Sequence, residues 1–182
     1  MKGSGHGART TAANKRYGFD GRFLGEVKSV AGLAPEMAAV KSTAEAVWEN
    51  DLPHGKGRVK GTSGGLAEVH VSWAARTGTS SGNTTPEELL AAAHASCFSM
   101  ALSGGLGRMQ KVPTELKVTA TATFDKVGEA WKVTTMELTV VGKVPGITAP
   151  EFDAAAQAAG QGCPISNVMK GNVAVTVKAS LA

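Results

Sequence analysis

The sequence of 182 residues predicts an α+β fold, with antiparallel sheets around buried central helices. Three observations support this prediction: alternating apolar and polar residues mark strands, a capping signal at Thr85 opens an apolar helix, and turn residues separate the segments. With 42% hydrophobic and 19% charged residues, the composition is typical of a soluble globular protein. The length suits one domain with an extension.

Residues 1–36 differ from the rest of the chain, since they are rich in glycine and basic residues and show no clear periodicity. They hold six of the 19 Lys and Arg residues but only three of the 15 Asp and Glu residues. Met37 resembles a natural protein start, so we predict an N-terminal extension of unknown role over 1–36 and the main domain over 37–182. The extension is either an upstream or added segment, or an arm that packs on the domain or on a partner subunit.

The chain shows no sign of a membrane or nucleic-acid partner. No apolar run approaches the roughly 20 residues that span a bilayer, and the basic N-terminus lacks the apolar core of a secretion signal. No basic stripe is interleaved with aromatic residues, as nucleic-acid binding would favour. We therefore expect a cytoplasmic protein that binds neither.

The first predicted strands lie before residue 76. Residues 43–48 and 57–62 flank turn residues, and residues 66–73 alternate so that their odd-numbered side chains share one face. We expect this third strand to lead directly into Arg76 and a polar loop over residues 76–83.

A helix follows this loop. Thr85 is the expected N-cap, Pro86 takes the first helical position, and Glu88 completes a capping box. We expect the helix to continue to about Ser103 and to end at Gly104 and Gly105. Because its middle is apolar all round, we expect it to be buried.

The second half of the domain alternates strongly. Residues 115–124 and 131–141 predict two long antiparallel strands, joined by a turn around Gly128. A helix is expected over residues 149–160, followed by a bend and a short helix. A final strand over residues 172–180 completes an expected meander around the buried helix.

The chain has only two cysteines, Cys97 and Cys163. A reducing compartment disfavours a permanent disulfide, so the two thiols are either inert packing residues or meet in the fold for redox chemistry. Cys97 lies too far into its helix for the helix dipole to activate it. His94, three residues earlier, is a local candidate cation or base, although a packed core histidine is the more common case.

Arg76 is a second candidate cation for Cys97, because arginine is always charged and can hold a carboxylate and a thiolate at once. Glu87 is the spare carboxylate beside it, since the capping box already explains Glu88. A pair of this kind is more often a surface ion pair, which contributes little to the stability of the fold. No metal site is expected, because His94-x-x-Cys97 alone is a weak ligand pattern.

Cys163 precedes Pro164 and is therefore the expected N-cap of the short helix, where free backbone N–H groups favour a thiolate. By this local argument Cys163 is the more acidic of the two thiols. The residues alone leave open which cysteine reacts first.

Three motifs resemble the OsmC/Ohr family of thiol peroxidases: "TPEELLAAAHASCFSMAL" (85–102), "VPGI" (144–147) and "GCPISNVM" (162–169). The histidine in the first motif points to the OsmC branch. The resemblance implies an OsmC-like fold, an intertwined homodimer with two active sites at the subunit interface, and reduction of organic hydroperoxides. It implies no metal and no organic cofactor.

The resemblance also implies residue roles. Cys97 matches the peroxidatic cysteine, Cys163 the resolving cysteine, Glu87 the catalytic acid and Arg76 the arginine at the thiolate. The implied cycle runs through a sulfenic acid on Cys97 and a Cys97–Cys163 disulfide, which an external dithiol, for example of the lipoyl type, reduces. Two alternatives remain: a dimer that binds an apolar ligand without catalysis, and a hydrolase that uses Cys97 with His94 as base.

Overall fold

A computed structural model of the chain describes residues 14–17, 23–27, 39–78 and 82–182. The chain divides into two compact units, Met1–Ser42 and Thr43–Ala182. The first unit contains strands β1 (Asn14–Tyr17) and β2 (Phe23–Val27), which pair antiparallel. This small sheet was not expected from the sequence, and the other residues of the predicted extension lie outside the described ones.

The second unit opens with a three-stranded sheet in the order β3-β4-β5. β3 (Ala44–Glu49), β4 (Lys56–Gly61) and β5 (Val69–Ser72) pair antiparallel, as predicted. The third strand is shorter than expected, because Ser72 ends it and starts helix α1 (Trp73–Thr77). The Ser72 hydroxyl accepts a hydrogen bond from the Ala75 N–H at 3.1 Å. Arg76 therefore lies on a helical turn and not at a strand end, which corrects the expectation.

Helix α2 (Pro86–Arg108) begins where the sequence predicted, but it extends to Arg108 instead of about Ser103, about 1.4 turns longer. Thr85 caps it by accepting from the Glu88 N–H at 3.0 Å. The capping box is incomplete, since the Glu88 carboxylate accepts instead from the Thr84 hydroxyl at 2.5 Å. Leu106 is fully buried, and its packing holds the last turns helical despite the glycines at 104 and 105.

The larger sheet has the order β6-β7-β8. β6 (Glu115–Val127) and β7 (Ala130–Lys143) form the predicted antiparallel pair around Gly128, whose φ is +62°. β8 (Ala174–Leu181) runs parallel to β7, so the expectation of a wholly antiparallel meander is wrong. Parallel neighbours need a long crossover, and here helices α3 (Ala149–Gly162) and α4 (Pro164–Met169) provide it.

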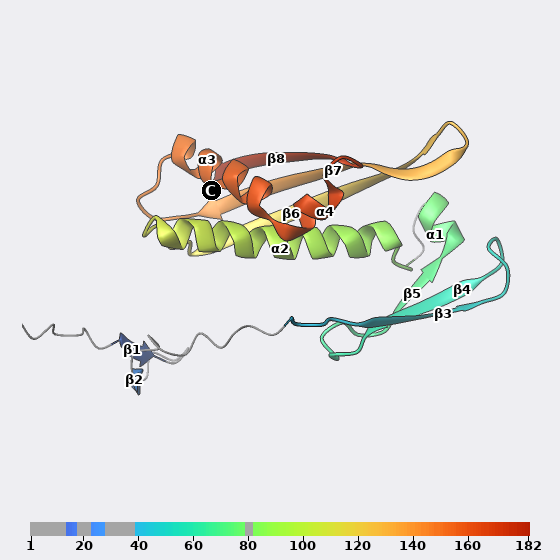
Figure 1. The fold of residues 1–182 in the computed structure, drawn as a ribbon, viewed down its shortest axis with the longest axis horizontal. Coiled ribbons are helices and arrows are strands. Elements are labelled where there is room, and N and C mark those ends of the chain that lie inside the picture. Colours follow the sequence, from blue (N-terminus) through green and yellow to red (C-terminus); the bar gives the residue numbers. More distant parts are fainter. Residues whose placement is uncertain (1–13, 18–22, 28–38, 79–81) are drawn as a thin grey trace, which may run out of the picture. The chain divides into compact units, whose positions relative to one another are not determined.

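The hydrophobic core lies between this sheet and the helices. α2 runs along β6, α3 runs along β8, and the two helices pack against each other (Figure 1). α3 begins with a complete capping box made by Thr148 and Glu151. The fully buried side chains of this core come from α2, from β7, and from α3 and its C-cap: Phe98, Leu102, Leu106, Leu138, Val140, Phe152 and Cys163.

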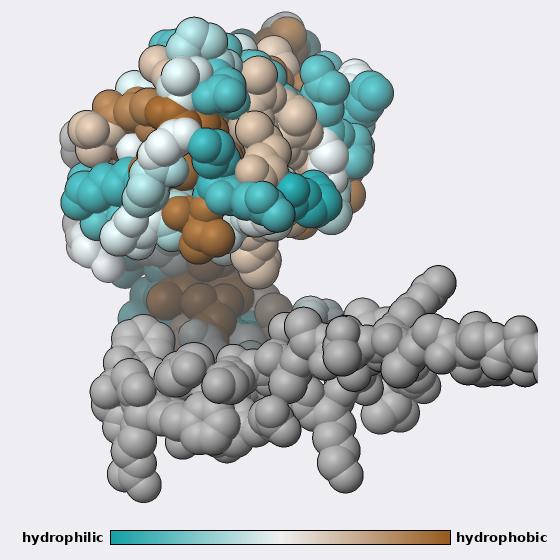
Figure 2. Space-filling view, turned by 90° about the vertical axis from the view of Figure 1, so that its left-hand side faces the viewer, coloured by the Kyte–Doolittle hydropathy of each residue, from teal (hydrophilic) through white to brown (hydrophobic). Residues whose placement is uncertain are grey.

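Within one chain α2 is buried on one face only, which corrects the expectation of a helix buried all round. Its buried positions recur every three or four residues, at Glu87, Ala91, His94, Phe98, Leu102 and Leu106. The other face is apolar yet exposed, with Met100 68% accessible. Apolar patches also interrupt the polar surface of the second unit at the end where α2 ends and α3 begins (Figure 2).

α2 is also long and apolar enough to cross a membrane by length and composition alone, contrary to the expectation of no such run. In the structure it packs on β6, α3 and α4. It is therefore the core helix of a folded unit, a class of helix that meets the same criterion.

Candidate active site: a dithiol pair

The structure brings the two cysteines together. The Cys97 and Cys163 sulfurs lie 3.2 Å apart, although the residues are 66 positions apart in sequence. Both thiols are free; Cys97 is partly exposed and Cys163 is buried. A disulfide has a sulfur–sulfur distance of about 2.05 Å, so the pair needs to close by only about 1 Å to be oxidised. The sequence left open whether the two thiols are separate packing residues or meet in the fold, and in the structure they meet.

Two chain segments create this contact. Cys97 lies in the middle of α2, one residue before the core side chain Phe98. Cys163 is both the last cap of α3 and the N-cap of α4, with Pro164 at the first helical position, as the sequence predicted. The sharp break between α3 and α4 therefore places Cys163 against the middle of α2.

The two thiols differ in acidity within one chain. Burial raises the pKa of Cys97, and the neighbouring Cys163 raises it further, against a hydrogen bond from the Ile165 backbone. Burial also acts to raise the pKa of Cys163. Hydrogen bonds from the Ser166 backbone, the Cys97 thiol, the Ser166 hydroxyl and the Ile165 backbone outweigh it, so the pKa of Cys163 is lowered. Of the two thiols, the local environment within one chain therefore favours the thiolate on Cys163.

Arg76 and Glu87 form the predicted pair. The Arg76 Nη2 atom lies 2.7 Å from Glu87 Oε1, and its Nε atom lies 3.0 Å from the same oxygen. This pair is not the weak surface ion pair that is common, because Glu87 is only 7% exposed. The guanidinium also lies over the Phe124 ring, 4.2 Å from its centroid, a contact that sequence reasoning missed.

The pair does not reach Cys97 within one chain. Glu87 precedes Cys97 by ten residues on one continuous helix, which separates them by about 15 Å along its axis. Among the described residues, no hydrogen bond or ion pair joins Arg76 to Cys97. The expected contact between the arginine and the thiolate is therefore not made in a single copy of the chain.

His94 is buried and does not act as a cation for Cys97. Its Nε2 atom lies 2.7 Å from the Ser166 hydroxyl, and burial lowers its pKa, which keeps the ring neutral. This arrangement favours the packed histidine over the catalytic base. Ser166 was not singled out from the sequence; its position three residues after Cys163, in the first turn of α4, was the available signal.

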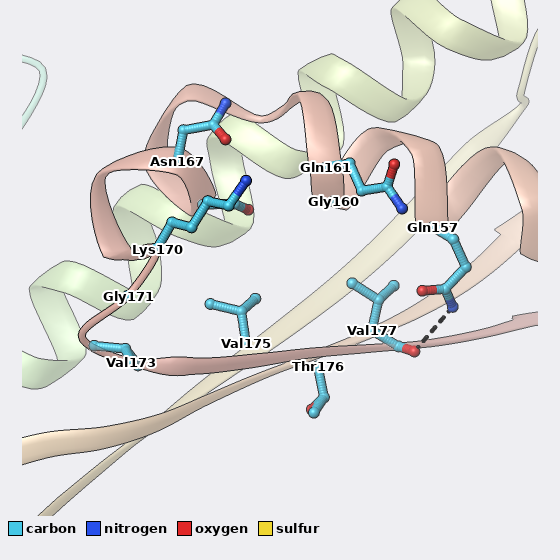
Figure 3. Close-up of a pocket in the computed structure, with 11 residues that line it drawn as sticks. Gln157, Gly160, Gln161, Asn167, Lys170, Gly171, Val173, Val175, Thr176 and Val177 are labelled. Carbon is cyan, nitrogen blue, oxygen red and sulfur yellow. Dashed lines mark hydrogen bonds between the residues drawn. The ribbon is translucent and has the colours of Figure 1, made fainter.

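Hollows flank the dithiol pair without containing either sulfur. One of about 720 Å³ lies between α3, α4 and β8, where Gln157, Lys170 and Val177 border it; Ser166 also lines it (Figure 3). A second of about 520 Å³ lies between α2 and α3 and is lined by Met100, Ala101 and Pro164 among others. In the described part of the chain, no three His, Cys, Asp or Glu side chains gather as metal ligands would.

The profile of the OsmC-like protein family matches residues 77–178, which include Glu87, Cys97 and Cys163. Arg76 lies one residue outside the matched segment. The chain is 41% identical to the peroxiredoxin OsmC of Escherichia coli over 134 residues, which cover 74% of this chain and 93% of that protein. It is 34% identical to the organic hydroperoxide resistance protein OhrA of Bacillus subtilis over 97 residues, 52% of this chain and 66% of that one.

Solved structures of organic hydroperoxide resistance proteins share the fold of this chain. An organic hydroperoxide resistance protein OsmC from Legionella pneumophila superposes with a TM-score of 0.64 and 25% identity, covering 79% of this chain and 98% of that one. An organic hydroperoxide resistance protein from Elizabethkingia anophelis gives a TM-score of 0.63 and 27% identity, covering 80% of this chain and all of that one.

Proposed function

Because the chain belongs to the OsmC-like family, we propose that it is a thiol peroxidase that reduces organic hydroperoxides to alcohols through Cys97 and Cys163. The observation that carries the proposal is the 3.2 Å contact between the two free thiols. The names of the relatives, a peroxiredoxin and organic hydroperoxide resistance proteins, support the substrate class. We place the reaction in the cytoplasm, where thiols are kept reduced.

In the proposed cycle the Cys97 thiolate attacks one oxygen of the peroxide. The O–O bond breaks, the alkoxide takes a proton and leaves as an alcohol, and Cys97 is oxidised to a sulfenic acid. The Cys163 thiolate then attacks the Cys97 sulfur, and hydroxide leaves and is protonated to water. The resulting disulfide is reduced by an external dithiol, and no metal or organic cofactor enters the cycle.

A homodimer supplies what one chain lacks. Within one chain the pKa of Cys97 is raised, chiefly by burial, and Arg76 lies too far away to counter this. In a two-fold dimer, every contact between two copies occurs twice. If the two α2 helices pack antiparallel so that Glu87 of the first copy lies near Cys97 of the second, then Glu87 of the second copy also lies near Cys97 of the first. The midpoint of such a pair is Ala92.

The exposed face of α2 suits this arrangement. Ala92, Ala93 and Ser96 are small and exposed, so two backbones can approach closely. Met100 supplies exposed apolar area beside them. We therefore propose that each active site combines the two thiols of one chain with Arg76 and Glu87 of the second copy. Residues 1–36 are proposed to lie outside this catalytic unit.

Thiol counting separates this function from its alternatives. We expect one equivalent of cumene hydroperoxide to remove two thiols per chain and to release one equivalent of the alcohol. Retention of both thiols would indicate a dimer that only binds apolar ligands. Ester cleavage with both thiols retained would indicate the hydrolase, which the structure already disfavours because His94 is bonded to Ser166 and not to Cys97.

A further inference from the structure

A buried hydrogen-bonded chain behind the dithiol pair has no part in the cycle described so far. His94 of α2 and Ser166 of α4 are 72 residues apart in sequence, yet His94 Nε2 lies 2.7 Å from the Ser166 Oγ. His94 is fully buried and Ser166 is 8% exposed. Ser166 lies three residues after Cys163, in the first turn of the helix that Cys163 caps, and its hydroxyl helps to lower the pKa of the Cys163 thiol. The Cys163 sulfur in turn contacts Cys97, so the four side chains lead from His94 to Cys97.

The direction of the hydrogen bonds follows from the second nitrogen of the ring. His94 Nδ1 is buried and has no hydrogen-bond partner. If that atom carried the proton, a donor would be buried unpaired, and Ser166 would have to donate to the ring. With the proton on Nε2, His94 donates to the Ser166 oxygen, and the Ser166 hydroxyl is free to donate to the Cys163 sulfur. Only this second arrangement stabilises a negative charge on Cys163.

This arrangement makes the two sulfurs of the disulfide unequal. When a thiolate attacks a disulfide, the sulfur that is better stabilised as a thiolate leaves faster. Cys163 is fully buried and the neighbouring Ser166 lowers the pKa of its thiol, whereas Cys97 is partly exposed. Within one chain, access and leaving-group stability therefore favour the same outcome, attack on Cys97 and departure of Cys163.

We propose that Ser166, oriented by His94, is a positioning residue that stabilises the departing Cys163 thiolate and so directs the reducing dithiol to the Cys97 sulfur. This inference rests on the proposed peroxidase function. In the step, a thiolate of the dithiol forms a bond to the Cys97 sulfur, and the Cys97–Cys163 bond breaks with its electron pair on Cys163. The second thiol of the dithiol then displaces Cys97, so the dithiol is oxidised and the protein disulfide is reduced.

The test maps the position of the first adduct. The wild-type protein is oxidised with one equivalent of cumene hydroperoxide and then treated briefly with one equivalent of 2-mercaptoethanol, a monothiol that has no second thiol for an intramolecular second displacement. After acid quenching, peptide mass spectrometry locates the mixed disulfide. We expect it on Cys97. A mixed disulfide found mainly on Cys163 would overturn the inference without needing any variant, while a wild-type protein that forms no disulfide would contradict the proposed function itself.

Variants test the role of Ser166 and His94. Ser166→Ala and His94→Phe should slow single-turnover reduction of the disulfide by dihydrolipoamide about 10- to 100-fold, the effect of losing a hydrogen bond to a charged group. Oxidation of Cys97 by the peroxide should keep its wild-type rate. Ser166→Thr, which retains the hydroxyl, should reduce at close to the wild-type rate, and Asn167→Ala, an exposed neighbour on α4, should show no change. Wild-type reduction rates in Ser166→Ala would overturn the inference and leave the proposed function intact.

Discussion

At the residue scale, the two glutamates that open α2 have different tasks although they are adjacent. Glu87 is buried and bonded to Arg76, whereas Glu88 is exposed and bonded to Thr84. Glu87→Ala should lower the peroxidase rate about 10- to 100-fold, because Arg76 loses its charged hydrogen bonds. Glu88→Ala should cost less than about 1 kcal/mol of stability, since the Thr85 cap to its backbone remains.

Steady-state rates and thermal melting of both variants test this division. Glu87→Gln is the matched control, because it keeps the size of the side chain and removes its charge. Similar losses of rate in the Glu87 and Glu88 variants would contradict it.

His94 predicts a pH dependence of stability. Burial lowers its pKa in the folded protein, so the unfolded chain binds this proton more readily than the folded one does. Stability from this group is present above its unfolded pKa of about 6.5 and is lost as the pH falls from there toward the folded value. Denaturant titrations between pH 7.5 and 5 should therefore show a larger loss for the wild type than for His94→Gln.

The exposed His70 provides the control for this experiment. His70→Gln should follow the wild-type curve. A His94→Gln protein that loses stability just as steeply would show that other groups cause the pH dependence.

The sequence singled out candidate reactive residues but not all of the side chains around them. Cys97, Cys163, Arg76 and Glu87 follow from their residue types and from the family motifs, and their roles remain predictions. Two neighbouring side chains were not predicted: Phe124, whose ring lies under Arg76, and Ser166, which is hydrogen-bonded to His94. Both act through contacts between segments far apart in the chain, which local patterns do not reveal.

At the element scale, local signals located the beginnings of helices better than their ends. The Thr85 cap and the strands around Gly128 were predicted because capping and alternation are local properties. The end of α2 and the direction of β8 were not, since the first depends on the burial of Leu106 and the second on the crossover through α3 and α4. The Ser72 cap also shortened a strand that alternation had extended to Trp73.

The Phe152 ring of α3 packs closely against the backbone of Gly142 in β7. A Cβ atom built on Gly142 would lie 2.4 Å from the Phe152 ring, which is fully buried. Gly142→Ala should therefore destabilise the protein by about 1–3 kcal/mol, as overpacking of a core does. Chemical denaturation measures this loss directly.

Gly107 in the last turn of α2 is the control. An added Cβ there would meet nothing within 4 Å, so Gly107→Ala should be neutral or stabilise the protein by up to about 1 kcal/mol. Equal stability of the two variants would contradict the proposed packing of Phe152.

At the scale of the whole molecule, the separation of Arg76 from Cys97 predicts shared active sites. The test uses heterodimers of one Cys97→Ser chain and one Arg76→Ala chain, purified with two different tags. If Arg76 acts across the interface, each heterodimer contains one complete site, because the intact Cys97 and the intact Arg76 lie on different chains. They should show about half of the wild-type rate per dimer. If Arg76 acted within its own chain, these heterodimers would be inactive.

The reciprocal heterodimer provides the control. It pairs a wild-type chain with a chain that carries both substitutions. Sharing across the interface predicts an inactive dimer, because the only Cys97 then lacks its arginine. Action within one chain predicts about half of the wild-type rate.

The central claim is that Cys97 reacts with the peroxide and Cys163 resolves the product. Mass spectrometry of the wild type, Cys163→Ser and Cys97→Ser after one equivalent of cumene hydroperoxide tests it most directly. We expect an intramolecular disulfide in the wild type, oxygen added at Cys97 in Cys163→Ser, and no oxidation in Cys97→Ser. The local environment makes Cys163 the more acidic thiol within one chain. A Cys97→Ser protein that gains oxygen at Cys163 and keeps turning over would therefore contradict the account.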